Sequence, residues 1–436
     1  MRVAMLKRAV AVSAVNVIVL CVVAELVSLA VFYYQHGWLF YLYPYRQTHE
    51  LIPETQNQQL TGDRLHPYFG PTHQAGIPFD IPESLRTAQS PRVATNNFGF
   101  ASARDYPFAK KSHQFVIGIF GGSVGLWFCH VGAHRLIEDL KRQTFFKDKE
   151  LVSLCLSHEG YKQPQQLLVL SYFLSIGQQF DAVVNIDGFN EVALASVNNQ
   201  RGSDISMPSA VHLDPLVNLI APSTLTPEKL ESLTAISRYK QRLYRLAKSI
   251  DESRLASIHL VLEQYYASVD RRYRNELAVF DKLPPNPPDR SIIRVTPKLR
   301  DREGTALFED IAREWITSST LMRELLAARG VAYFHFLQPN QYYTTRAFSR
   351  EEARVALSDE SPYKKSVEQG YPFLVREAVS RTAKSGSVSV LDGTRIFDRE
   401  PSPVYVDNCC HYTLVGNEIL ADFIAKTILD SKGAWR

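Results

Sequence analysis

The chain has 436 residues, enough for one large domain or two ordinary ones with a substantial core. Hydrophobic residues make up 45% and charged residues 22%, values that are typical of a globular protein and exclude wholesale disorder. The formal net charge is only +4 and no basic tract is interleaved with aromatic residues, so nucleic-acid binding is not expected.

The N-terminal segment is predicted to cross a membrane. Residues 9–34 form an almost unbroken apolar run, long enough as a helix to span a hydrocarbon core of about 30 Å. Arg2, Lys7 and Arg8 precede the run. Aromatic residues follow it, as at a membrane interface: Trp38, Tyr41, Tyr43 and Tyr45. The positive-inside rule then places residues 1–8 in the cytoplasm and the large remainder on the exoplasmic side, periplasmic or extracellular.

Two polar residues interrupt this run. Asn16 and Glu25 are costly in lipid, at about 3 kcal/mol for an acidic residue at the centre of a membrane helix. Glu25 is off centre, where protonation or a partner helix would reduce the cost. The alternative is a cleaved signal peptide, because residues 28–30 (Ser-Leu-Ala) include the small side chains that a signal peptidase needs. The run is longer than the apolar region of a usual signal, about 7–15 residues, which favours an uncleaved anchor. Both alternatives export the rest of the chain.

The five cysteines have neither the pattern of a disulfide framework nor the paired C-x-x-C spacing of a structural zinc site. Cys21 lies in the apolar N-terminal run. Cys129 and Cys155 are interpreted as small buried hydrophobes. Cys409 and Cys410 stand beside a candidate catalytic histidine, and we expect them to pack around it. No cluster of metal ligands is visible, and no metal or cofactor is expected.

The rest of the chain is predicted to form a stem and one α/β domain. Residues 35–113 are rich in Pro, Gln, Thr and His without a sustained period, and are interpreted as a juxtamembrane stem that wraps onto the domain. In residues 114–432, short apolar runs alternate with stretches of helical spacing, which predicts a mostly parallel sheet in a three-layer α/β/α sandwich. Strands are expected at residues 115–120, 151–156, 180–186 and 331–337, and helices after residue 123, at 165–176 and at 309–329.

Residues 193–318 interrupt this alternation. They contain helical stretches at residues 237–250 and 254–277, followed by a proline-rich loop at 284–288. We interpret them as a largely helical insertion into the α/β domain, and a lid over the site is one role that it could have.

The first chemical candidate is Ser123, in the turn Gly121-Gly122-Ser123. A serine on a glycine turn between a buried strand and a helix has its hydroxyl at the sheet edge where open α/β sheets bind ligands. Its own N–H, near the N-terminus of the helix, can stabilise an oxyanion. Gly-Gly-Ser is also an ordinary tight turn, and the Lys-Ser/Thr ending of a phosphate-binding loop is absent.

Three further residues follow the later strands. Gly160 comes after the second strand, Asn190 after the third, and His411 lies near the C-terminus before an amphipathic helix. Alone, each has an ordinary alternative: Gly160 as a turn, Asn190 as a helix cap and His411 as a satisfied polar residue. Together and in this order, Ser123, Gly160, Asn190 and His411 resemble the four sequence blocks of the SGNH (GDSL-type) hydrolases. More specifically, the chain resembles bacterial SGNH-hydrolase-like proteins with an N-terminal membrane segment.

The resemblance implies a role for each residue. Ser123 would attack an ester carbonyl while His411 takes its proton. The N–H groups of Ser123 and Gly160 and the side-chain amide of Asn190 would form the oxyanion hole. An acidic residue would orient His411. The family has Asp three residues before its histidine, where this chain has Asn408; Asp407 lies one position further away, and a one-residue bulge would bring it to the ring.

Other polar residues are weaker candidates. Gln338 and Asn340 leave the strand at 331–337 at the same sheet edge and are possible substrate contacts, although loop structure explains them equally well. His335 lies on an apolar strand and is expected to be a core histidine. His158 is near Gly160, but we assign it no role.

The resemblance and the expected compartment together suggest an exported serine esterase that removes O-acyl groups, O-acetyl above all, from an envelope or extracellular glycan. An O-acyltransferase acting on an exported polysaccharide is the first alternative, since a sugar hydroxyl can replace water. The second is a non-catalytic glycan-binding or assembly component that keeps the fold. The expected partners are an acylated glycan or another ester substrate, the membrane through residues 9–34, and envelope-assembly proteins.

Overall fold

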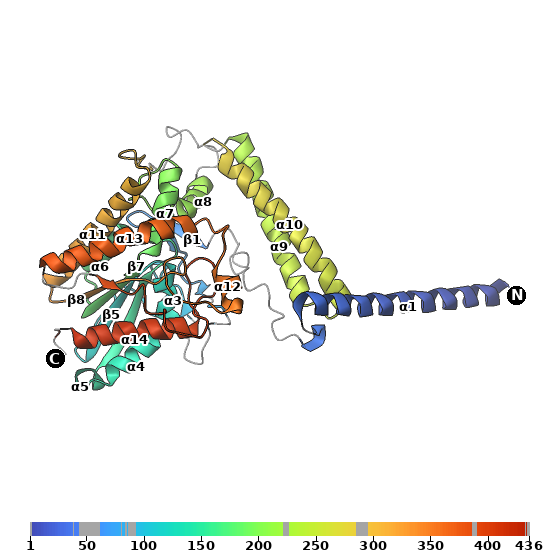
Figure 1. The fold of residues 1–436 in the computed structure, drawn as a ribbon, viewed down its shortest axis with the longest axis horizontal. Coiled ribbons are helices and arrows are strands. Elements are labelled where there is room, and N and C mark those ends of the chain that lie inside the picture. Colours follow the sequence, from blue (N-terminus) through green and yellow to red (C-terminus); the bar gives the residue numbers. More distant parts are fainter. Residues whose placement is uncertain are drawn as a thin grey trace. The chain divides into compact units, whose positions relative to one another are not determined.

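The computed structural model describes residues 2–37, 39–42, 62–79, 81–82, 85, 93–220, 226–284, 295–385, 390–431 and 433. The chain divides into two compact units (Figure 1). Unit 1 comprises Met1–Thr61 and Ala221–Ser291, and unit 2 comprises Gly62–Ile220 and Ile292–Arg436. Three of the expected interfacial aromatic residues (Trp38, Tyr43 and Tyr45), residues 43–61 of the stem and residues 285–288 of the proline-rich loop lie outside the described residues.

Unit 2 is built on a parallel sheet of five strands. The strands are β5 (Gln114–Gly121), β6 (Glu150–Ser157), β7 (Ala182–Asp187), β8 (Ala332–Leu337) and β9 (Leu391–Asp392), in the spatial order β6-β5-β7-β8-β9. Four of them were predicted from the apolar runs; β9 is only two residues long and gives no such signal. Because β6 and β7 lie on opposite sides of β5, the order of the sheet reverses there, and open α/β sheets bind ligands at such a switch point.

Both faces of the sheet are covered. All eight residues of β5 are buried. Phe115, Ile117 and Ile119 pack into one core cluster with helices α4 and α14, whereas Val116 and Phe120 pack into a second cluster with α6. The continuous apolar run of β5 thus reflects burial on both sides, as expected for a parallel strand.

Helices connect the strands of unit 2. They are α3 (Ser123–Val131), α4 (Ala133–Lys141), α5 (Thr144–Lys147), α6 (Gln165–Ser175), α7 (Phe189–Gln200), α8 (Ala210–Ile220), α11 (Thr305–Ala327), α12 (Arg350–Ala356), α13 (Lys364–Ser385) and α14 (Leu414–Asp430). The helices predicted after residue 123, at 165–176, at 309–329 and after His411 correspond to α3, α6, α11 and α14.

From Gly62 onward, the described part of the stem belongs to unit 2 and forms two small pairs of strands. Strands β1 (Asp63–His66) and β2 (Gly70–His73) pair antiparallel, as do β3 (Pro78–Phe79) and β4 (Val93–Ala94). Helix α8 contacts the first hairpin, and the Tyr161 hydroxyl donates a hydrogen bond to the Pro71 carbonyl at 2.7 Å. The segment that begins at Gly62 therefore packs on the α/β domain and reaches the loop that follows β6.

Unit 1 consists of the N-terminal helix and a helical hairpin. Helix α1 spans Arg2–His36, the short helix η1 spans Phe40–Leu42, and the hairpin consists of α9 (Pro227–Asp251) and α10 (Ala256–Lys282). Within α1, residues Val15–Gln35 are long and apolar enough to cross a membrane. The hairpin packs against α1. The insertion was predicted to comprise residues 193–318. Only its residues 221–291 belong to unit 1, because α7, α8 and α11 belong to unit 2.

Candidate active site

Ser123, His411 and Asp407 form a hydrogen-bonded relay. The Nε2 atom of His411 lies 2.8 Å from the Ser123 hydroxyl, and its Nδ1 atom lies 2.5 Å from an oxygen of Asp407. Ser123 is the first residue of α3, while Asp407 and His411 lie in the loop before α14. A carboxylate that accepts a proton from Nδ1 leaves a lone pair on Nε2, which is the atom that faces the serine.

The acidic member of the relay is Asp407 and not Asn408. One oxygen of Asp407 accepts the backbone N–H groups of Cys409, Cys410 and His411 at 2.9, 3.0 and 3.3 Å. These three bonds curl the chain so that the other oxygen meets His411, four residues later. The Asn408 side chain is exposed, and its carbonyl accepts the Tyr342 hydroxyl at 3.0 Å. Asp407 therefore reaches the ring through the tight turn that its own side chain stabilises.

Two glycines allow the turn at Ser123. Gly121 has φ +152°, and a Cβ there would lie 2.3 Å from the Ile186 carbonyl oxygen on the neighbouring strand. A Cβ at Gly122 would lie 2.1 Å from the amide nitrogen of Asn190. The turn thus lets β7 and the Asn190 side chain approach the serine closely. The N-cap of α3 is Gly122, which has no side chain, and the Ser123 hydroxyl faces Nε2 of His411.

Gly160 and Asn190 lie beside this turn. They follow β6 and β7, the two neighbours of β5, so all three positions share one edge of the sheet. Asn190 donates one amide N–H to the Tyr161 carbonyl at 2.8 Å, and an amide carries a second donor. Gly160 has φ +72°, and a Cβ there would lie 2.3 Å from the His212 ring. Gly160 does form a turn, and Asn190 lies in the first turn of α7, which Gly188 caps.

The local electrostatics favour a protonated His411 and an ionised Asp407. Burial by itself lowers the pKa of His411, but the adjacent Asp407 carboxylate outweighs burial and raises that pKa to about 9. Burial tends to raise the pKa of Asp407, and His411 together with the backbone N–H groups lowers it overall. The imidazolium form of His411 is therefore stabilised, and the ring is mostly neutral only above about pH 9.

Trp127 is a member of the site that the sequence reasoning missed. Its indole stacks on the His411 ring, with centroids 4.8 Å apart and an interplanar angle of 21°. It lies four residues after Ser123 on α3, and residues at that spacing share a helix face. An indole face attracts a cation, so the stack also favours the imidazolium. The i+4 spacing was the signal that could have identified it.

The loop after β8 supports the histidine loop. The Asn340 amide donates to the Cys409 carbonyl at 3.0 Å, and the Gln341 amide donates to the Asp407 carbonyl at 3.0 Å. Asn340 is completely buried and Gln338 is 3% exposed. The predicted substrate contacts are therefore not supported: both side chains lie inside the protein, and that of Asn340 holds the histidine loop. His335 is a buried core histidine, as predicted, between Ser319 and Asp187.

A charged cluster anchors the Gly160 loop to the β1–β2 hairpin. The His73 ring lies 2.9 Å from an Asp63 oxygen and 3.1 Å from a Glu159 oxygen. Burial lowers the pKa of His73, but the two carboxylates raise it to about 10. Glu159 precedes Gly160, so this pairing ties the loop to the stem. The N–H of a buried His158 faces the Glu159 carbonyl at 2.9 Å, and burial lowers its pKa to about 4.

Among the residues that the structure describes, two groups of side chains could hold a metal, although neither has a recognisable spacing in the sequence. Potential ligand atoms of Asp63, His73 and His158 lie within 4.8 Å of one another, as do those of Cys409, Cys410 and His411. In the first group His73 already pairs with Asp63, and in the second His411 belongs to the relay. The relay chemistry itself requires no metal.

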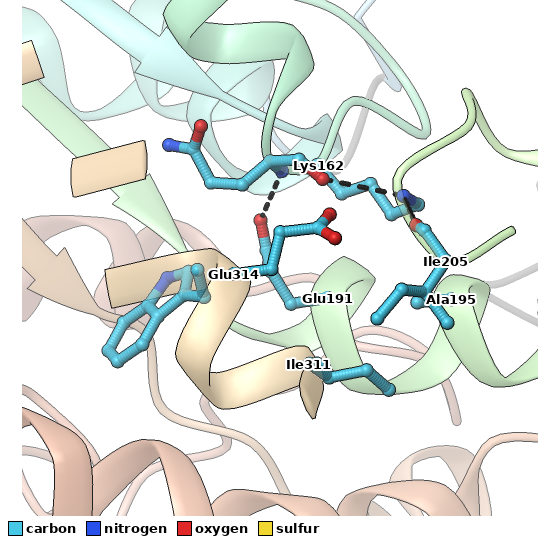
Figure 2. Close-up of a pocket in the computed structure, with 8 residues that line it drawn as sticks. Lys162, Glu191, Ala195, Ile205, Ile311 and Glu314 are labelled. Carbon is cyan, nitrogen blue, oxygen red and sulfur yellow. Dashed lines mark hydrogen bonds between the residues drawn. The ribbon is translucent and has the colours of Figure 1, made fainter. Parts of the chain in front are cut away.

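A second buried polar cluster is formed around Lys162 and Glu191, the residue that follows Asn190 in the chain (Figure 2). Glu191 accepts the backbone N–H groups of Gln163 at 3.0 Å and Gly188 at 2.7 Å, and so joins the loop after β6 to the start of α7. The Lys162 ammonium donates to the Ile205 carbonyl. Burial lowers the pKa of Lys162 to about 8 and, together with Asp187, raises that of Glu191 to about 8. Glu191 therefore helps to fix Gly160 relative to Asn190.

Cys129 and Cys155 form a disulfide bond, which corrects their interpretation as isolated buried hydrophobes. Their Cα atoms are 5.8 Å apart, and the bond joins α3 to β6. The two residues are 26 positions apart and lack any framework spacing, so no sequence pattern indicates the pair. Cys409 and Cys410 pack in the core around the histidine loop, as predicted.

Comparison of the chain with protein-family models finds no match, and comparison with curated protein sequences finds none either.

Proposed function

We propose that the chain is a serine esterase of the SGNH type, anchored in the cytoplasmic membrane, that removes O-acyl groups from an envelope or extracellular glycan. The Ser123–His411–Asp407 relay, with contacts of 2.8 and 2.5 Å, carries the proposal. The order of the five strands and the burial of both sheet faces support a three-layer SGNH-type sandwich for unit 2.

The proposed reaction follows from the geometry of the relay. His411 takes the proton of Ser123 as the hydroxyl oxygen bonds to the ester carbonyl carbon, and Asp407 stabilises the imidazolium. The backbone N–H groups of Ser123 and Gly160 and the second amide N–H of Asn190 stabilise the oxyanion. Each such donor typically contributes about 3–4 kcal/mol. His411 then protonates the leaving alkoxide, and water attacks the acyl-enzyme by the same steps in reverse.

The disulfide supports the proposed exoplasmic location of unit 2. Disulfides persist in oxidising compartments and are rare in the cytosol. The Cys129–Cys155 bond lies inside the α/β domain, next to the nucleophile helix. An oxidising compartment agrees with export of everything that follows α1, and with a cytoplasmic location of residues 1–8.

Packing within unit 1 supports an uncleaved anchor. Glu25 and Leu29, on the C-terminal half of α1, contact the start of α10. A peptidase cut at residues 28–30 would separate Glu25 from α10 and would break the helix within this contact. The exposed apolar side chains of α1 agree with a lipid environment: between Val12 and Leu26 they are 51–68% exposed.

Esterase assays on matched variants test the proposal. The full chain, purified in detergent, would be tested for p-nitrophenyl acetate hydrolysis beside Ser123→Ala and His411→Ala. We expect both variants to lose nearly all activity, with unchanged melting temperatures. Equal rates in all three proteins would refute a Ser123 esterase and favour the non-catalytic glycan-binding alternative.

The choice between water and sugar as acyl acceptor needs its own measurement. The same reaction run with added oligosaccharide would be analysed by mass spectrometry for released acid and for acylated sugar. Released acid as the main product supports the esterase, whereas transfer exceeding hydrolysis would assign the O-acyltransferase activity instead. An O-acetylated glycan that loses acetate only with active enzyme would support the proposed substrate class.

A further inference from the structure

Glu25 is the N-terminal cap of another helix. One of its oxygens accepts the backbone N–H of Ala256 at 2.7 Å and the Tyr41 hydroxyl at 2.9 Å. The other accepts the backbone N–H of Ser257 at 3.1 Å and the Ser257 hydroxyl at 2.6 Å. Helix α10 has no side-chain cap of its own, so Glu25 satisfies its first N–H groups and complements its dipole. The carboxylate in the apolar helix thus has a specific partner.

Apolar contacts fix the same junction. Leu29 and Phe32 of α1 pack with Phe40, Ala256 and Leu260, and the last two belong to α10. Phe32, Phe40 and Ala256 are at most 1% exposed. The start of α10 is therefore bound to α1 at residues 25–32, inside the apolar stretch Val15–Gln35.

The length of α1 sets the depth of this junction in a bilayer. A helix needs about 20 residues to cross a hydrocarbon core of about 30 Å. If Lys7 and Arg8 mark the cytoplasmic boundary, residues 9–28 fill the core, so that Glu25 lies within about one helical turn of the opposite boundary and Phe32 lies beyond it. The proposed membrane anchoring therefore places the start of α10 among the lipid headgroups of the outer leaflet.

The surface at this end of the hairpin combines apolar and basic side chains. Leu255, Ile258, Val261 and Tyr265 are 44, 49, 69 and 51% exposed. Residues 237–254, which form the C-terminal half of α9 and the turn, contain six basic and two acidic residues, a net charge of +4. The whole chain also has a net charge of +4, so the charges of its other residues sum to zero. The exposed basic residues nearest the turn are Arg245, Lys248 and Arg254, and Arg238 and Arg242 lie further along α9.

We propose that the end of the α9–α10 hairpin next to α1 is a docking surface for anionic lipid headgroups, with Ile258, Val261 and Tyr265 in the interface. The inference rests on the proposed membrane anchoring. Two observations select lipid as the occupant: the surface is continuous with the membrane helix through Glu25, and its basic charge complements an anionic leaflet. Figure 1 shows α10 starting at the C-terminal part of α1 and leading away from it. The start of α10 therefore lies nearest to the membrane, and its C-terminal end lies further away.

Site-specific photocrosslinking in vesicles tests this surface. The full chain, carrying p-benzoylphenylalanine at position 261 or 279, would be reconstituted in phosphatidylcholine vesicles with or without phosphatidylglycerol. Val279 is a matched control: it is 50% exposed on the same helix, and five helical turns, about 27 Å, further along the same face. After irradiation, adducts are identified by mass.

We expect lipid adducts at position 261, a lower yield without phosphatidylglycerol, and none above background at 279. Glu25→Ala should lose the adducts at 261. No lipid adducts at 261, or equal yields at both positions, would overturn the proposal, and a protein adduct at 261 would assign the surface to a protein partner.

Extraction with alkaline carbonate distinguishes a failure of the proposed membrane anchoring from a failure of the proposed docking surface. If the chain leaves the vesicles, the membrane anchoring itself fails. If it stays but position 261 is not labelled, only the docking surface fails. Circular dichroism and esterase activity of the labelled chains report whether each variant is folded.

Discussion

Replacing Asp407 with Asn is the most decisive test of the relay. One oxygen of Asp407 accepts three backbone N–H groups, so the asparagine would keep its own oxygen there and turn its amide toward His411. The amide then donates to Nδ1, which places the ring proton on Nε2, where it faces Ser123. A histidine in this tautomer cannot accept the proton of the serine.

We expect Asp407→Asn to lower kcat by about four orders of magnitude, as the same replacement does in other triads. That corresponds to about 5.4 kcal/mol of activation free energy, at 1.36 kcal/mol per tenfold. The pKa of His411 should also fall, because the Asp407 carboxylate is what raises it to about 9. The residual activity of Asp407→Asn should therefore reach its plateau at a lower pH than the activity of the wild type.

The assay is p-nitrophenyl acetate hydrolysis from about pH 6 to about pH 10, the range in which a perturbed histidine titrates. Asn408→Ala is the matched control. Its side chain is exposed and only its carbonyl takes part in the loop, so its activity should stay near wild type. Activity of Asp407→Asn within tenfold of wild type, or an equal loss in Asn408→Ala, would refute the assignment.

Three further predictions follow from neighbouring features. His411 must be neutral to act as a base, and its pKa is raised to about 9, so kcat/KM should rise about tenfold per pH unit below pH 9 and level off above it. A pH profile with its half-maximum near the ordinary pKa of histidine would contradict the pairing of His411 with Asp407. His73→Ala should lower kcat about tenfold to a hundredfold with little change in KM, because it frees the loop of Gly160. His73→Lys, which keeps a cation, should recover part of this loss. An unchanged kcat in His73→Ala would show that His73 does not position the loop. Replacing Cys129 and Cys155 with Ser should lower the free energy of unfolding by about 3–4 kcal/mol, from the loop closed across 26 positions, measured by urea titration; no change would mean that the bond does not form.

Much of the fold could be predicted because buried parallel strands leave a direct signal. Apolar runs located β5, β6, β7 and β8. In a parallel sheet, the residues that follow the strands meet at one edge, so Ser123, Gly160 and Asn190 could be placed together without a structure. The outer strand β9, with only two residues, carries no such pattern.

The sequence left the choice between Asp407 and Asn408 open because the answer depends on a turn, not on spacing alone. Three backbone N–H groups on one carboxylate oxygen bring a residue four positions away to the ring. The His73–Glu159 contact and the Cys129–Cys155 bond were likewise out of reach, because they join segments whose approach is decided only by the packed fold.

The bond between Glu25 and Ala256 joins residues 231 positions apart, and this has a consequence for the order of assembly. A ribosome adds roughly 5–20 residues per second, so about 10–50 seconds pass between the synthesis of the two partners. Throughout that time α1 is already made while the helix that its carboxylate caps does not exist. Unit 1 can therefore be completed only after most of the first α/β segment, Ser123 included, has emerged.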